Sequence, residues 1–189
     1  GRCVKLENSF EVAAPPEKAW DLLMDVPRIV PCMPGATLDE VVDDSNWKAT
    51  MQVKLGPIGL TFATDVERKE VDEASRRVVL GANARETRNR GRASATIQSA
   101  LTPTDAGTKI DLVTDISLSG TVAQYGRGMI EDVSSQMVTS FAQCLEAQLG
   151  ESAEEAEQAV AAQAKPISGL SLFFGSLWRR IRRIGRRSS

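Results

Sequence analysis

The feature that most restricts the fold of this chain is a long alternation of apolar and polar residues over residues 47–118. A period of two predicts β-strands that each present one apolar face. Turn signals at 56–59, 72–75, 89–91 and 104–107 divide this segment into successive hairpins. We therefore expect an antiparallel sheet with one apolar face, which another element must cover.

Residues 120–149 are expected to supply that cover. Apolar residues recur there at spacings of three, four and seven, which predicts a single amphipathic helix of about eight turns. The residues of this apolar stripe are Val122, Met129, Val133, Met137, Phe141 and Leu145.

The N-terminal part adds a strand over residues 4–13 and two small helices. Pro15 and Pro16 suit the start of the first helix, and three further prolines interrupt the second before residues 36–42 become extended again. A long helix across a curved antiparallel sheet, with two small helices after the first strand, is an α+β helix-grip arrangement. Such an arrangement usually encloses a hollow.

Composition excludes several kinds of chemistry. The chain has no histidine, the residue on which most general acid–base relays and many zinc and copper sites depend. Its three cysteines, Cys3, Cys32 and Cys144, form no C-x-x-C pair, so we expect no metal site and interpret them as reduced structural residues. A nucleophilic role for Cys32 is disfavoured because no histidine can activate its thiol.

Charge divides the chain into parts. Residues 1–164 carry a net charge of −9, whereas residues 165–189 hold seven basic residues and no acid. We expect a helix-grip ligand-binding domain over 4–150, a flexible Glu/Ala-rich tether over 151–165 and a basic amphipathic membrane-binding helix over 166–189. Residues 1–3 are left out of the functional interpretation.

The basic tail separates its apolar and charged residues completely on a helical projection. The apolar face consists of Leu170, Phe173, Phe174, Leu177, Trp178, Ile181 and Ile184, and the arginines outside it are Arg179, Arg180, Arg182, Arg183, Arg186 and Arg187. Its uncharged run is shorter than the ~20 residues needed to span a bilayer, so we expect it to lie in the interface with anionic lipids. A helix docked on a partner protein is the alternative, and the aromatic stripe disfavours nucleic acid.

Three segments of the chain, 25–35, 53–58 and 118–127, resemble CoxG, an accessory family of carbon monoxide dehydrogenase within the SRPBCC superfamily. They contain Cys-x-Pro-Gly, Lys-x-Gly-Pro-Ile and Gly-x-x-Ala-Gln-x-Gly-Arg, and the resemblance covers roughly residues 4–150. It implies a non-catalytic accessory protein of the molybdenum hydroxylase carbon monoxide dehydrogenase, which attaches the enzyme to the inner face of the cytoplasmic membrane. With no secretory signal recognised, we expect a cytoplasmic, peripheral location.

A hollow in this fold would be apolar and suited to a lipophilic ligand. The residues expected to contact the ligand are Met51, Val53, Phe62, Leu112, Ile116, Tyr125, Met129, Val133, Met137 and Phe141. Gly120, Gly126 and Gly128, around Tyr125, are interpreted either as letting a backbone approach the ligand or as close packing of helix on sheet. The alternative for the whole set is an ordinary filled core.

Our functional hypothesis joins these parts. The protein is expected to recruit carbon monoxide dehydrogenase to the membrane and to shelter a respiratory quinone, menaquinone or ubiquinone, with no covalent cofactor and no metal of its own. A membrane adaptor without a ligand is one alternative, and a lipid-binding or cyclase-type protein of another pathway is the other. Asp111 and Asp115 are the nearest carboxylates for catalysis, but alternation places them on the outer face of their strand.

A group of arginines surrounds the expected turn at 89–91. Arg85, Arg88, Arg90 and Arg92 are opposed only by Glu86. They are interpreted either as a docking site for an acidic partner or as an ordinary solvated turn.

Overall fold

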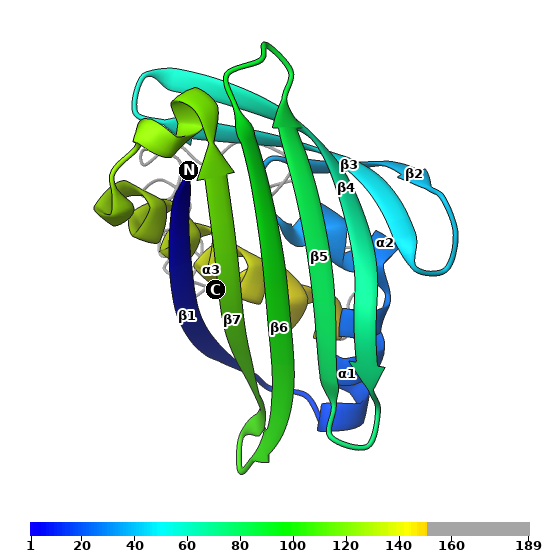
Figure 1. Cartoon of the computed structure of the whole chain (residues 1–189). Helices are drawn as coiled ribbons and strands as arrows, with labels where there is room; N and C mark the ends of the chain where they lie inside the picture. The colour runs from blue at the N-terminus through cyan, green and yellow to red at the C-terminus, as the bar shows by residue number, and fades with distance from the viewer. Residues whose placement is uncertain (151–189) are drawn as a thin grey trace, which may run out of the picture.

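The computed structural model describes residues 1–150, which form one curved antiparallel sheet of seven strands (Figure 1). The strand order is β1-β7-β6-β5-β4-β3-β2, so only the β1–β7 pair joins strands distant in the sequence. The strands are β1 (Arg2–Val12), β2 (Ala36–Val41), β3 (Asn46–Leu55), β4 (Ile58–Asp72), β5 (Arg77–Glu86), β6 (Arg92–Thr104) and β7 (Gly107–Ser119). The antiparallel sheet and its tight turns confirm the prediction from the alternating pattern.

Helical segments lie at the two chain crossings of the sheet. They are α1 (Pro16–Met24), α2 (Val26–Ile29), the 3-10 turn η1 (Val30–Cys32), the 3-10 turn η2 (Gly120–Gln124) and α3 (Arg127–Leu149). The long helix α3 crosses behind the concave face of the sheet and packs on β1, α1 and η1 (Figure 1). This arrangement confirms the α+β helix-grip fold.

The start of the long helix differs from the prediction. Residues 120–124 form the separate turn η2, and α3 begins only at Arg127. Gly120 has a φ of +74°, and a Cβ on it would lie 2.7 Å from the Cα of Gly91. This close approach of two turns requires glycine and prevents the helix from starting earlier. For Gly120 the packing interpretation is therefore correct, whereas a Cβ on Gly126 or Gly128 would meet nothing within 4 Å.

The apolar side chains form two separate cores on the concave face. The main core joins α1, the C-terminal half of α3 and the adjacent halves of the strands, and includes Trp20, Ile110, Phe141 and Leu145. The second core, at the other end of the sheet, is built on Leu60, Phe62, Leu118 and Val122. Each fully buried large apolar side chain contributes roughly 1.5–3 kcal/mol to folding.

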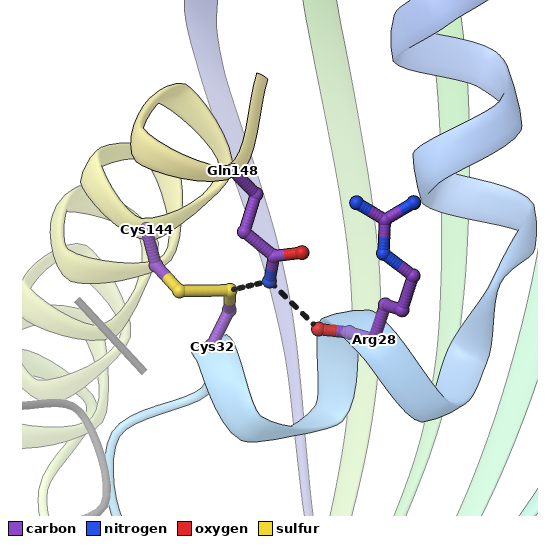
Figure 2. The surroundings of a disulfide bond; sticks show 4 residues. All are labelled: Arg28, Cys32, Cys144 and Gln148. Carbon is purple, nitrogen blue, oxygen red and sulfur yellow. Dashed lines mark hydrogen bonds between the residues drawn. A yellow bond between two sulfur atoms is a disulfide. The ribbon is translucent and has the colours of Figure 1, made fainter. Parts of the chain in front are cut away.

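A disulfide between Cys32 and Cys144 joins η1 to α3 (Figure 2). The expectation that these cysteines are reduced is therefore wrong, because the fold brings residues 112 positions apart to a Cα–Cα distance of 5.4 Å. Gln148 strengthens the same junction: its Nε2 donates hydrogen bonds to the carbonyl of Arg28 at 2.9 Å and to Cys32 Sγ at 3.1 Å (Figure 2). Cys3, in contrast, is free and exposed.

The pairing register slips at two places in the sheet. The β2–β3 pairing is irregular between Leu38 and Glu40, and the β4–β5 pairing between Arg68 and Glu70. Each slip leaves one residue without a partner, which is the signature of a β-bulge and increases the local twist. Of the two, the bulge at Asp39 lies on the edge strand β2.

Removal of the disulfide is expected to destabilise the domain substantially. Cys144→Ala should lower the free energy of unfolding by about 2–5 kcal/mol, since the bond closes a loop of more than 100 residues. Urea denaturation followed by circular dichroism measures this change. The control Cys3→Ala should stay within about 0.5 kcal/mol of the wild type, and equal effects of the two substitutions would contradict a structural disulfide.

Candidate functional site

The concave face between the two cores is lined by small side chains. Ala82 pairs with Ala95 and Ala84 with Ala93 across β5 and β6, and all four face α3 in the register of the sheet. All four are only partly buried, although they lie on the face that the helix covers. Alanine side chains are too short to reach the helix, so solvent reaches the sheet surface between the cores. We call this region the hollow.

Half of the expected ligand-contacting residues gather at one end of this hollow. Phe62 belongs to the second core, and Met51, Val53, Ile116 and Tyr125 pack against it. Leu112 and Phe141 belong instead to the main core at the other end. Phe141 there packs edge-on against Phe10, with ring centroids 6.3 Å apart. The predicted set is thus divided between the two walls of the hollow.

The remaining three expected ligand residues lie on α3. Met129 is 41% exposed, so its side chain is not enclosed between helix and sheet as expected. The physical reason is the late start of α3, which leaves Met129 in the first turn of the helix, before the helix reaches the main core. Val133 and Met137 are half-buried.

Thr64 is a polar side chain of the hollow that the sequence analysis did not single out. In register it lies between Ala49 on β3 and Ala84 on β5, which places it on the concave face. Its Oγ1 atom is buried and makes no hydrogen bond within residues 1–150. A buried hydroxyl without a partner costs free energy, and a ligand oxygen could satisfy it. The alternation alone cannot reveal such a missing partner.

Glu86 organises the turn next to the second core. Its side chain is 1% exposed and accepts hydrogen bonds from the backbone N–H groups of Arg88 at 2.7 Å and Arg90 at 3.1 Å. The Arg90 guanidinium donates to Glu86 Oε1 at 2.9 Å and to the carbonyl of Gly59 at 2.7 Å. The hydrogen bond from the Arg90 side chain, helped by those from the backbone, lowers the pKa of Glu86 to about 2.

These contacts assign different positions to the four arginines of this turn. Arg90 is engaged by Glu86 and ties the β5–β6 turn to the β3–β4 hairpin. Arg85, Arg88 and Arg92 are exposed.

The lowered pKa of Glu86 predicts how stability depends on pH. Its contribution is complete above the ordinary pKa of 4.5 and is lost as the pH falls toward 2. Glu86→Gln should therefore lower the Tm clearly at pH 7, and the difference from wild type should shrink below pH 4. Thermal melts across this range measure it. Glu131→Gln, which removes an exposed ion pair with Arg127, should change the Tm little at any pH; a constant difference for Glu86→Gln would refute the assignment.

The outer face of the sheet has its own shallow groove of about 560 Å³. Its lining includes Asp65, Asn83, Arg85 and Ser94, and none of the expected ligand residues. Asp111 also lies on the outer face as predicted, paired with Lys109 at 3.5 Å. Asp115, opposite Lys5, lies there as well. A catalytic carboxylate pair from these two aspartates inside the hollow is therefore excluded.

Two further searches of residues 1–150 give negative findings. No group of three or more His, Cys, Asp or Glu residues there is arranged to hold a metal ion. Within the same range, no helix is long and apolar enough to cross a membrane. The expected tether and membrane-binding helix, 151–165 and 166–189, lie outside the described residues.

Solved structures with this architecture are helix-grip proteins. A conserved protein from Geobacillus kaustophilus matches with a TM-score of 0.69 and 21% identity, over 77% of this chain and 95% of its own. An aromatase/cyclase from a Streptomyces species gives 0.56 and 16% over 78% and 94%, and truncated norcoclaurine synthase from Thalictrum flavum gives 0.50 and 17% over 80% and 96%. At these identities the likeness defines the fold: a curved sheet that grips one long helix, as in the SRPBCC superfamily.

Within that class the sequence identifies the family. The family model of the carbon monoxide dehydrogenase component CoxG matches residues 9–150, and this chain belongs to that family. A search of curated proteins finds no match. The resemblance inferred from the motifs is confirmed, and family membership points to an accessory protein of carbon monoxide dehydrogenase.

Proposed function

We propose that this protein serves carbon monoxide dehydrogenase as a membrane-attached carrier that shelters a respiratory quinone, menaquinone or ubiquinone, in the hollow. The observation that carries the proposal is the stretch of small, partly open side chains between the two cores. A core that existed only for stability would be filled at this place, because interiors pack densely. The family supports the partner enzyme, and the hollow supports the lipophilic cargo.

The chemistry of a quinone fits the walls of the hollow. An isoprenoid chain is apolar and flexible, and would contact the half-buried Met51, Val53 and Ile116 on the sheet with Val133 and Met137 on the helix. A quinone carbonyl oxygen would accept a hydrogen bond from Thr64 Oγ1, the unpartnered hydroxyl on the concave face. Apolar walls with few placed polar groups are typical of small-molecule sites.

This chain's part in the reaction is to bind, orient and release. Reduction of a quinone to a quinol takes two electrons and two protons, and carbon monoxide oxidation by the partner enzyme supplies the electrons. A quinone in a bilayer is difficult for a soluble enzyme to reach. A carrier that holds the quinone head group near Thr64 would present it to the enzyme outside the lipid.

Filling the hollow is expected to remove the cargo. Ala95→Trp introduces a large ring at its centre and should lower the amount of bound quinone by about tenfold or more, because the ring occupies the ligand's volume. The measurement is mass spectrometry of an organic extract from protein purified without detergent out of a quinone-producing host.

The neighbouring residue on the same strand provides a matched control. Thr96 lies on the outer face of β6, so Thr96→Trp should leave the bound quinone unchanged. Thermal melts of both variants check that each is folded. Absence of quinone from the wild-type protein would contradict the carrier and leave a membrane adaptor.

Attachment to the membrane is proposed to use the basic tail. Reversing two of its charges, Arg182→Glu with Arg183→Glu, should weaken binding to anionic vesicles by at least about 2 kcal/mol, since each arginine near an anionic leaflet contributes about 1 kcal/mol. Vesicle co-sedimentation at rising salt measures this, and binding of the wild type should weaken as salt increases. Equal binding of both proteins would contradict attachment through the tail.

A further inference from the structure

The charges of the described domain are unevenly distributed. Residues 54–59, 85–92 and 120–127 gather at the end of the sheet formed by the β3–β4 hairpin, the β5–β6 turn and η2 (Figure 1, top). We call this region the basic end, because it holds six basic residues and one acid, Glu86. The other residues of the range 1–150 hold 10 basic and 20 acidic residues. The domain is therefore a strong electrostatic dipole.

Most cations of the basic end are free to meet a partner. Glu86 neutralises Arg90, and Arg127 pairs with Glu131. Across residues 1–150, no ion pair engages the four exposed cations that remain. These are Lys54, Arg85, Arg88 and Arg92.

One pair of these cations is arranged at a cost to the fold. Arg85 and Arg92 lie directly opposite each other on β5 and β6. Like charges at opposed positions destabilise a sheet. An anionic surface would relieve this repulsion.

Apolar side chains project at the same end. Ile58, at the β3–β4 hairpin, is 39% exposed, and Met129, at the start of α3, is 41% exposed. A Cβ on Gly56 or Gly59, which flank Pro57 and Ile58, would meet nothing within 4 Å, so no other part of the described domain packs over this hairpin tip. Exposed apolar residues among basic ones are typical of surfaces that lie in the lipid interface.

We propose that the basic end is a second membrane-contact surface, which seats the folded domain on anionic lipid headgroups with the β3–β4 hairpin tip toward the bilayer. Both the charges and the apolar tip favour lipid over an acidic protein surface, which would use the charges alone. The second core and its side of the hollow lie at this end, so the hollow would face the bilayer. The proposal rests on the proposed function only in that the tail would bring the domain to the same membrane.

The opposite end of β4 offers an internal comparison. Val71 lies near the end of the same strand and is 42% exposed, similar to Ile58. Its neighbours Asp72 and Glu73 are acidic, and an anionic surface would repel them. Exposure of an apolar side chain alone therefore does not define the contact surface; its charged surroundings do.

Binding by charge variants of the full chain tests the surface. In Lys54→Glu with Arg88→Glu, binding to phosphatidylcholine vesicles that contain phosphatidylglycerol should fall by about tenfold or more. Lys69→Glu with Arg77→Glu makes the same change of net charge at the other end of β4 and β5 and should have a much smaller effect. Equal losses in the two variants would overturn the proposal, because the domain would then respond only to net charge.

Site-specific fluorescence tests the orientation. In a Cys3→Ser background, Ile58→Cys and Val71→Cys are each labelled with an environment-sensitive dye in the full chain. The dye at 58 should shift to the blue on addition of the anionic vesicles and the dye at 71 should not. Shifts at both positions, or at neither, would overturn the proposal. Unchanged vesicle binding by Lys54→Glu with Arg88→Glu, together with loss of binding to the partner enzyme, would assign the basic end to an acidic protein instead.

Failure of this proposal and failure of the carrier function can be told apart. The vesicle experiments need no quinone, and the quinone extraction with Ala95→Trp needs no membrane. A protein that holds quinone but gives no dye shift at 58 would keep the carrier and lose the second contact surface. A protein that orients on vesicles without quinone would do the reverse.

Discussion

The structure depends on the way α3 is held at one end. Its C-terminal half buries Phe141, Cys144 and Leu145 in the main core, and the disulfide to Cys32 and the hydrogen bonds of Gln148 secure the same end. Its N-terminal half carries no fully buried residue before Ser140. A helix fixed in this way covers one half of the concave face closely and the other half loosely. The hollow and the separation of the two cores follow from this.

The second core needs a different support because α3 contributes little to it. Glu86 provides that support: it closes the β5–β6 turn through backbone N–H groups and holds Arg90, which in turn reaches Gly59 on β4. The Arg90 carbonyl also accepts a hydrogen bond from the N–H of Val122 at 3.0 Å. One buried carboxylate thus connects two turns and η2 at the end where the exposed arginines lie. Charge and packing at this end are parts of one network.

Local features of the sequence were sufficient to predict most of the fold. The period of two and the turn residues located all the hairpins, and the prolines located α1 because they act on their own backbone. Features that depend on distant residues were missed or wrong. The Cys32–Cys144 pairing joins segments 112 residues apart, and the late start of α3 depends on Gly120 meeting Gly91. The free hydroxyl of Thr64 and the burial of Glu86 depend on neighbours from other strands, and no periodicity encodes them.

An open sheet of seven strands also has two edges, and β2 shows how one of them is protected. This strand has only six residues, and its pairing with β3 is interrupted at Asp39, which is followed by Glu40. A short strand with a bulge and adjacent carboxylates is a poor template for another strand, because the backbone groups are out of register and the charges repel. The same irregularity that twists the end of the sheet therefore opposes edge-to-edge aggregation. A protein concentrated at a membrane surface would benefit from that protection.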